Sequence, residues 1–458
     1  MAAVVEVGTS QAPRLAALVA GPADRVVAFD GARPVTRAAF ERHVRAVAAD
    51  LPSAPHAVNL CDDRYRFIVA LCAAALRGQV TLLPSSRAPG VIDAVLADHP
   101  DAICIADADL DPAPPRTWRL PDVLDGIDGA PLQVLADAPL VIGFTSGSTG
   151  HPKPNLKTLA SFATSTAQNL AAIGDLLHPG ATTPLVATVP PQHMYGMEMS
   201  VLLPMLGDVA VHGARPFFPQ DVARALADCP RPALLVTTPV HLRALVQACA
   251  DDPSFALPPM AGIVSATAPL ARELALAAED AFGCEVRELF GSTETCILAR
   301  RRTAQGDAWS LLPGVRLAPQ PDGTLASAEH LAAPVLLADL VELLPDGRFE
   351  LRGRNADLLE IAGKRASLGD LTRRLLAVPG VRDGVVVQLE PDACGVRRIA
   401  ALAVAPGLAP ADILRALRAQ MDPVFLPRRL RCVAQLPRNE TGKLPRASLI
   451  ALLQDRTR

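Results

Sequence analysis

Short apolar segments alternate with helix-like segments along the first two thirds of the chain, and this alternation constrains the fold more than any other feature. Residues 35–50 carry apolar side chains at helical spacing, and residues 67–76 are Ala-rich and uniformly apolar, as in a buried helix. The apolar segments have the length of buried strands and lie at 102–105, 141–144, 185–189, 233–237, 262–264 and 286–289. Strands that alternate with helices predict an α/β fold with parallel sheet.

The pattern changes twice towards the C-terminus. Residues 308–353 contain short strands and turns, and Pro345-Asp346-Gly347 predicts a hairpin between 341–344 and 348–351. Further on, the order helix, strand, strand, helix, strand is predicted for 368–377, 384–389, 399–404, 410–420 and 430–433. We therefore predict a large N-terminal domain of layered αβ sheets with a small β-rich subdomain (1–355) and a small, mobile α+β C-terminal domain (356–458).

Composition excludes several classes of protein. The net charge of −3 argues against nucleic acid or an anionic membrane as the main partner. No uncharged apolar run reaches the length of about 18 residues that a membrane span needs, and residues 1–6 lack the basic and apolar regions of a signal peptide. The nine cysteines are dispersed without a Cys-x-x-Cys pair, which is typical of reduced thiols. These features predict a cytoplasmic globular protein.

A loop rich in glycine and hydroxyl side chains follows the strand at 141–144. It reads Thr145-Ser146-Gly147-Ser148-Thr149-Gly150-His151-Pro152-Lys153-Pro154. Glycines allow backbone N–H groups to approach a ligand closely, and the hydroxyls and the lysine supply donors and charge, so the loop suits phosphate. It lacks the Gly-Lys-Ser/Thr ending of a Walker A loop. An ordinary surface loop is the alternative interpretation.

A second cluster, Phe290-Gly291-Ser292-Thr293-Glu294-Thr295, follows the strand at 286–289. Open α/β sheets bind ligands at the carboxyl ends of their strands. There an aromatic ring can stack on a base, hydroxyls can hold phosphate, and Glu294 can hold Mg²⁺. The alternative is a helix N-terminus with Glu294 in its first turn.

Two further segments place a lysine on a loop flanked by glycine. They are 353–365, which contains Gly363-Lys364, and 437–446, which contains Gly442-Lys443. A lysine in such a loop can be delivered to an anion. Taken singly, each segment is more typical of a solvated charged surface.

The order and spacing of all four clusters resemble those of the adenylate-forming superfamily, which includes acyl-CoA synthetases, aryl-acid ligases and adenylation domains of peptide synthetases. The resemblance covers nearly the whole chain, and the loop from Thr145 to Lys153 matches the superfamily signature in full. Residues 190–197 are similar to its histidine-containing segment beside the acyl pocket. Residues 265–270 are similar to its Ala-Pro-Leu segment near the adenine.

The resemblance implies a reaction in two halves, with the active site between the two domains. A small carboxylic acid attacks the α-phosphate of Mg-ATP, which gives an acyl-adenylate and pyrophosphate. A thiol then takes the acyl group and releases AMP. The implied thiol is the phosphopantetheine of coenzyme A (CoA) or of an acyl carrier protein.

The resemblance also implies a role for each residue of the motifs. For the nucleotide, these are Thr145, Ser146, Gly147, Ser148, Thr149, Gly150 and Lys153 on the β- and γ-phosphates, Thr267, Phe290, Gly291 and Ser292 around the adenine, and Asp339 with Arg354 on the ribose. For the chemistry, they are Thr293 on the α-phosphate, Glu294 on Mg²⁺, His193 beside the acyl pocket, Lys443 between carboxylate and phosphate, and Gly363 in the loop that lines the pantetheine tunnel.

Some positions depart from the superfamily pattern. Phe290 stands where tyrosine is usual, Leu337-Ala338 replaces Thr-Gly before Asp339, and Ala356 occupies the hinge position. The histidine-containing segment favours an aryl acid such as a hydroxybenzoate or cinnamate. A fatty acyl substrate is the alternative, and a catalytically weak adenylate-binding protein is a second hypothesis.

Overall fold

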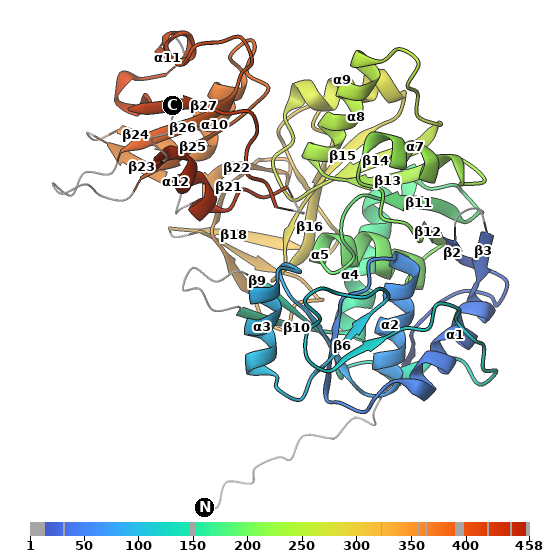
Figure 1. The fold of residues 1–458 in the computed structure, drawn as a ribbon. Coiled ribbons are helices and arrows are strands. Elements are labelled where there is room, and N and C mark those ends of the chain that lie inside the picture. Colours follow the sequence, from blue (N-terminus) through green and yellow to red (C-terminus); the bar gives the residue numbers. More distant parts are fainter. Residues whose placement is uncertain are drawn as a thin grey trace, which may run out of the picture.

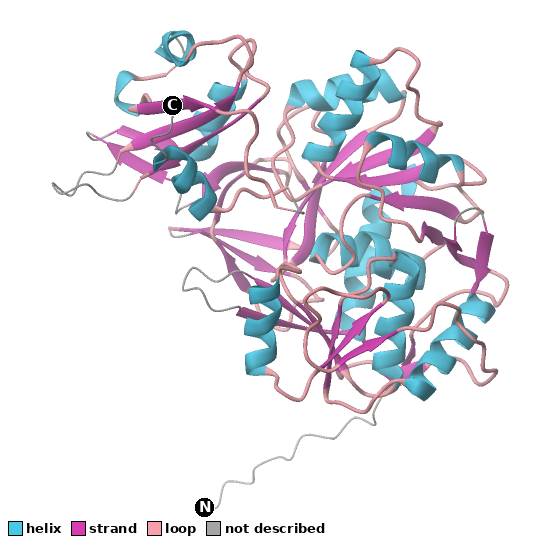
Figure 2. Ribbon diagram, in the orientation of Figure 1, coloured by secondary structure: helices cyan, strands magenta, loops and turns pink. Residues whose placement is uncertain are grey.

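A computed structural model describes residues 14–30, 33–145, 153–321, 323–354, 358–361, 364–389, 398–418, 421–439 and 442–454. Figure 1 shows a large part drawn in blue to yellow and a smaller C-terminal part in orange and red. Helices and strands are interleaved throughout the large part (Figure 2). The predicted α/β class is confirmed.

A nine-stranded sheet forms one half of the large part. Its central strands are parallel and its edge strands β3, β16 and β17 are antiparallel to their neighbours. In spatial order the strands are β17 (Ser310–Leu311), β16 (Cys296–Arg301), β15 (Val286–Ser292), β14 (Met260–Ser265), β13 (Ala233–Thr237), β11 (Thr183–Ala187), β12 (Val209–His212), β2 (Val26–Asp30) and β3 (Arg33–Thr36). The strands predicted at 185–189, 233–237, 262–264 and 286–289 all belong to this sheet.

A six-stranded sheet forms the other half. All of its strands are parallel except β10, which pairs antiparallel with β9. In spatial order they are β10 (Lys153–Thr158), β9 (Pro139–Thr145), β5 (Val80–Leu83), β4 (His56–Asn59), β6 (Ile103–Ala106) and β7 (Thr117–Arg119). A two-stranded ribbon of β1 (Leu15–Ala17) and β8 (Gln133–Leu135) lies apart from both sheets.

Helix α2 (Arg64–Leu76) joins the two sheets, because it contacts β4 and β5 of one and β2 and β12 of the other. A helix that is buried on all sides needs apolar residues all round, and 67–74 are uniformly apolar and buried. The predicted helix is thus confirmed, but it starts at Arg64, where Asp63 caps it by accepting a hydrogen bond from the Arg66 amide. The helix predicted at 35–50 is α1 (Arg37–Asp50).

The remaining helices of the large part cover the sheets. Helices α7, α8 and α9 share one apolar cluster with β11, β13, β14 and β15. Their bounds, with those of the other helices, are α3 (Pro89–Asp98), α4 (Leu159–Ile173), η1 (Gly174–Leu176), α5 (Met194–Met197), η2 (Glu198–Leu202), α6 (Leu203–Leu206), α7 (Pro219–Ala227), α8 (Pro239–Asp251) and α9 (Arg272–Phe282).

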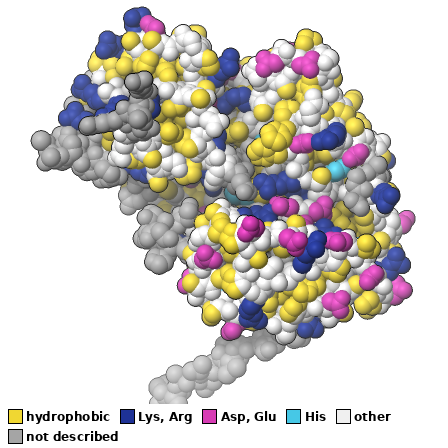
Figure 3. All heavy atoms as spheres, viewed as in Figure 1, with side chains coloured by type: hydrophobic (Ala, Val, Ile, Leu, Met, Phe, Trp, Pro, Cys, Tyr) yellow, Lys and Arg dark blue, Asp and Glu magenta, His cyan; other side chains and the backbone are white. Residues whose placement is uncertain are grey.

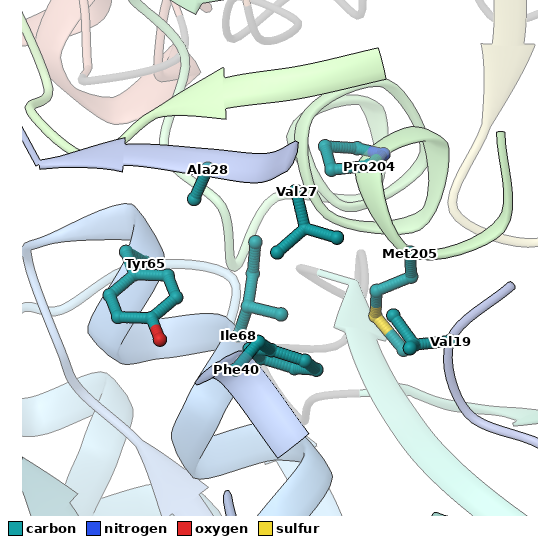
Figure 4. Close-up of a pocket in the computed structure, with 8 residues that line it drawn as sticks. All are labelled: Val19, Val27, Ala28, Phe40, Tyr65, Ile68, Pro204 and Met205. Carbon is teal, nitrogen blue, oxygen red and sulfur yellow. The ribbon is translucent and has the colours of Figure 1, made fainter. Parts of the chain in front are cut away.

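A small apolar cavity of about 10 Å³ lies in the core between α1, α2, β2 and α6 (Figure 4). Its lining includes Phe40, Ile68 and Met205. A cavity of this size holds no more than about one water molecule. It is a packing gap in the core and has no room for a carboxylic acid substrate.

Small antiparallel units follow the large sheets. The predicted hairpin is confirmed as β21 (Asp339–Leu343) and β22 (Phe349–Arg354), and it is longer than predicted on both sides. Next to it lies a three-stranded sheet of β18 (Arg316–Gln320), β19 (Gly323–Ser327) and β20 (Val335–Leu337). These units place Asp339 at the start of the hairpin.

The C-terminal part has its own apolar clusters, whose buried residues all lie between 359 and 453. This separation agrees with a boundary near residue 356, although the division into two domains stays a prediction. Its elements are β23 (Leu358–Ile361), β24 (Lys364–Ser367), α10 (Leu368–Leu376), β25 (Asp383–Gln388), β26 (Ile399–Val404), α11 (Pro410–Arg418), η4 (Pro423–Phe425), β27 (Arg429–Cys432) and α12 (Arg446–Gln454).

No helix among the described residues is long and apolar enough to pass through a membrane.

Candidate active site

Three of the predicted motifs meet at Gly143 on β9. A Cβ atom placed on Gly143 would lie 3.0 Å from Cε of Met194 and 3.1 Å from Cγ2 of Thr293. Met194 directly follows His193, and Gly143 lies two residues before Thr145. The strand leading into the phosphate-type loop, the histidine-containing segment and the Thr293–Glu294 segment therefore adjoin one another.

The Thr293–Glu294 segment is a tight turn between the antiparallel strands β15 and β16. The alternative of a helix N-terminus is therefore wrong. The turn is closed from within, since the Ser292 amide donates to Oγ1 of Thr295 (3.2 Å) and the Thr295 amide donates to Oγ of Ser292 (3.3 Å). Cys296, which ends the turn, has a left-handed backbone (φ 59°).

Gly291 is required where β15 enters this turn. A Cβ atom on Gly291 would lie 2.1 Å from the carbonyl oxygen of Cys296. Because that neighbour is backbone, a side chain at this position would push the strands apart. The glycine thus serves the close approach of β15 and β16 that holds Thr293 and Glu294 at the turn.

Thr267 has a strained backbone in the segment predicted to lie near the adenine. Its φ of 81° is rare for a β-branched residue, and such strain clusters at functional sites. The segment is anchored at its end, where the Leu270 amide donates to the buried carboxylate of Glu288 (3.0 Å). Glu288 is itself paired with Arg301 at 2.7 Å.

Phe290 belongs to a cluster of three aromatic rings. Its ring centroid lies 5.6 Å from that of Trp309 and 6.0 Å from that of Phe349. Phe349 begins β22, and in the β21–β22 hairpin Asp339 lies directly opposite Arg354. Phe290 therefore contacts the hairpin that carries Asp339 and Arg354, at the end opposite these two residues.

His193 occupies the N-cap position of α5 without a capping hydrogen bond from its side chain, and its Nδ1 atom is buried without a hydrogen-bond partner among the described residues. Burial and, to a smaller extent, the charge of Lys443 lower the pKa of His193 to about 3. The imidazole is therefore neutral at pH 7. The effect of Lys443 also means that this C-terminal lysine lies within electrostatic reach of His193.

A short loop presents Lys443. The Lys443 amide donates to Oδ1 of Asn439 (2.8 Å), and the Gly442 amide donates to the Asn439 carbonyl (2.9 Å). Gly442 has a left-handed backbone (φ 77°), and a Cβ atom there would lie 3.3 Å from Val240 of α8. The loop therefore packs directly against the N-terminal turn of α8.

A chain of ion pairs ties the same loop to α8. Arg438 donates to both carboxylate oxygens of Asp383 at 2.8 and 3.0 Å. Arg243 of α8 approaches the same carboxylate at 3.7 Å. Burial lowers the pKa of Arg243, the Asp383 charge opposes this, and Arg438 adds to it. Asp383 is thus shared by one arginine from each side of the boundary.

The residues at Glu294 fit a magnesium ion bound through nucleotide phosphates. Glu294 is half-buried, and none of the described residues donates a hydrogen bond to its carboxylate. No group of three or more His, Cys, Asp or Glu side chains in the described ranges could hold a metal. Mg²⁺ often binds through one or two carboxylates plus phosphate oxygens, which a single free carboxylate beside a phosphate site would satisfy.

Part of the predicted site lies outside the described residues: Ser146, Gly147, Ser148, Thr149, Gly150 and Gly363, together with the side chain of Arg354. Of the first loop, Thr145 ends β9 and Lys153 begins β10, where the two residues pair across the hairpin. The roles of all these residues stay predictions.

Four residues near the site were not predicted as site residues: Lys157, Arg243, Asp383 and Arg438. Lys157 lies four positions after Lys153 in a strand of mixed polarity, and sequence gives no sign that it is buried. The three charged residues come from different segments, so only the folded chain brings them together.

A two-part α/β fold that brings together the strand before the first loop, the histidine-containing segment and the Thr293–Glu294 turn fits the class of nucleotide-dependent ligases. The profile of the family described as "AMP-binding enzyme" matches residues 14–321. The chain belongs to this family, which is an enzyme family of acid–thiol ligases.

Two curated relatives illustrate the range of the family. The 4-coumarate–CoA ligase of Rhodobacter capsulatus is 30% identical over 65% of this chain and 73% of its own length. The isonitrile lipopeptide synthase of Streptomyces coeruleorubidus is 38% identical over 26% of this chain, but this region is only 8% of that protein. Among solved structures, an anthranilate CoA ligase in complex with anthranoyl-AMP has a TM-score of 0.79 at 17% identity and covers 94% of both chains, which shows the shared fold.

Proposed function

We propose that this protein activates an aryl carboxylic acid with Mg-ATP to an acyl-adenylate and then transfers the acyl group to the thiol of CoA or of a carrier protein. The observation that carries the proposal is the meeting of three motifs at Gly143, where an added Cβ atom would lie 3.0 Å from Met194 and 3.1 Å from Thr293. The charge of Lys443, which contributes to the lowered pKa of His193 after burial, supports its assignment to the adenylating step.

Each residue has a physical task in the first half-reaction. The acid and the α-phosphate are both anionic, so Lys443 would offset their repulsion as they approach. Thr293 would donate to the α-phosphate, and Lys153 would contact the outgoing pyrophosphate. Mg²⁺ held by Glu294 would neutralise charge on the phosphates. His193, being neutral, would border the acid without adding a competing cation.

We favour an acid without an amine as the substrate. A substrate ammonium group would need a free carboxylate as its partner. The buried carboxyl on the helix after His193 is Glu198, and its Oε1 already accepts hydrogen bonds from Asn169 and from the Ile297 amide, both at 3.1 Å. The relative named for 4-coumarate adds support for an aromatic acid. A fatty acid remains the alternative substrate.

The charge distribution favours an anionic acceptor. Residues 356–458 contain 17 Lys and Arg against ten Asp and Glu, whereas residues 1–355 contain 27 against 37. Figure 3 shows Lys and Arg side chains in dark blue over the C-terminal part, where Arg373, Arg398, Arg415, Arg418 and Arg428 are exposed. CoA carries phosphates on its nucleotide, and an acidic carrier protein would present the same sign of charge.

The proposal is tested by exchange of radioactive pyrophosphate into ATP with a panel of hydroxybenzoates, cinnamates and fatty acids. Product mass is then measured with CoA and with a phosphopantetheine-loaded carrier. We expect exchange with an aromatic acid and one thioester product. ATP binding without exchange for any acid would instead support the adenylate-binding hypothesis, and much faster turnover of long-chain acids would reverse the aryl assignment.

A further inference from the structure

Lys157 is a buried lysine beneath the turn that carries Glu294. It lies near the end of β10, only 6% of its surface is exposed, and its Nζ donates a hydrogen bond of 2.7 Å to the carbonyl oxygen of Glu294. β10 and the β15–β16 turn belong to different sheets. The lysine therefore spans from the six-stranded sheet to the turn of the nine-stranded sheet.

Two other buried ionisable side chains hold the same turn. Nε2 of His330 forms a hydrogen bond of 2.7 Å with the Thr295 carbonyl, and Oε1 of Glu198 accepts from the Ile297 amide at 3.1 Å. His330 and Glu198 are 4% and 1% exposed. Three side chains from separate parts of the chain thus bind the backbone here, at Glu294, Thr295 and Ile297.

Burial of an ammonium group is costly unless it is paired and hydrogen-bonded. Burial has the largest effect on the pKa of Glu198 and of His330, and the positive charge of Lys157 acts to lower both pKa values. The three side chains therefore form one electrostatic group. Packing alone would not need such a group, because an apolar side chain could fill the position of Lys157 without a desolvation cost. What the lysine adds is a fixed position for the Glu294 carbonyl.

We propose that Lys157 is a positioning residue for the nucleotide-bound metal ion, acting through Glu294. By holding the Glu294 carbonyl in the interior, it fixes the backbone from which the Glu294 carboxylate reaches the metal. The inference rests on the proposed function, since it assumes that Glu294 binds the metal. Groups that orient metal ligands typically change metal affinity or activity by about 10–100-fold when they are removed.

The test measures metal binding directly. Mn²⁺ replaces Mg²⁺ and is followed by electron paramagnetic resonance in the presence of a non-hydrolysable ATP analogue. Lys157→Met, which removes the charge and keeps the aliphatic stem, should weaken Mn²⁺ binding by about tenfold. Binding of the analogue without metal should stay unchanged, and Lys157→Arg should restore part of the Mn²⁺ affinity.

Arg25→Met is the matched control. Arg25 is also 6% exposed and donates to backbone carbonyls, namely those of Ala20, Pro204 and Gly207, but it lies in the core behind α6. It should lower the melting temperature without changing Mn²⁺ affinity. An equal loss of Mn²⁺ affinity in Arg25→Met and Lys157→Met would reduce the effect to general destabilisation and overturn the inference.

The experiment distinguishes failure of the proposed function from failure of the inference about Lys157. If the wild-type protein binds no Mn²⁺ with the analogue, the proposed function fails. If the wild type binds and Lys157→Met binds equally well, only the inference fails. Should Lys157→Met not fold, His330→Leu takes its place, because it removes the neighbouring hydrogen bond to Thr295 and should weaken Mn²⁺ binding by about fivefold. Unchanged binding in that variant would overturn the inference as well.

Discussion

Arg243 on α8 and Asp383 on β25 form an ion pair with 3.7 Å between Nη1 and Oδ1. The pair joins the large part of the chain to the C-terminal part, and Asp383 also holds Arg438 in the segment that leads to Lys443. The segment that leads to Lys443 is therefore tied to α8, which is far from it in sequence.

We expect Arg243→Gln to slow pyrophosphate exchange by about two- to fivefold, since partly exposed ion pairs contribute up to about 1 kcal/mol. The side chains are 34% and 17% exposed, so the melting temperature should change little. Arg415→Gln, which removes an exposed arginine of α11, is the control and should leave exchange unchanged. Slower thioester formation from supplied acyl-adenylate with normal exchange would contradict this role of Arg243.

The protonation of His193 gives a prediction for pH dependence. Its folded pKa of about 3 lies below the ordinary value of 6.5, so the unfolded chain takes up a proton that the folded chain does not. The stability contributed by the neutral imidazole is present above pH 6.5 and is lost as the pH falls towards 3. Nitrogen NMR of labelled histidine should find His193 neutral at pH 5.5, and Lys443→Met should raise its pKa. A titration of His193 near pH 6.5 would contradict the lowered pKa of this half-buried histidine.

A substitution at Gly291 tests whether the geometry of the Thr293–Glu294 turn matters for activity. Gly291→Ala should reduce exchange strongly, because the added Cβ would meet the Cys296 carbonyl at 2.1 Å and force the Thr293–Glu294 turn to move. Gly306→Ala has open space around its Cβ and is the matched control. The measurement is kcat and KM for ATP. A Gly291→Ala enzyme with wild-type values for both would show that the position of the turn does not matter for adenylation.

Local patterns were sufficient for much of the fold. The apolar spacing of 35–50 and the uniform apolarity of 67–76 predicted α1 and α2, because these helices bury the faces that the spacing defines. The turn of Glu294 could not be predicted in the same way. Its residues satisfy a helix N-terminus equally well, and pairing of β15 with β16 decides between the two.

Site residues could be predicted only where a short motif contains the side chains that would act in the reaction. The first loop, the Glu294 cluster and Lys443 were found from residue types and their order. Lys157 and Asp383 were not, because their importance comes from burial and from partners distant in sequence. Short-range patterns do not contain that information.

The role of Lys443 is tested most directly by separating the two half-reactions in Lys443→Met. We predict that acid-dependent pyrophosphate exchange falls by about 10²–10³, as when a donor to developing charge is removed, while thioester formation from chemically supplied acyl-adenylate stays near the wild-type rate. Arg446→Gln, a change of an exposed cation three residues away, should affect neither reaction. Wild-type exchange in Lys443→Met, or an equal loss in both half-reactions, would contradict the account.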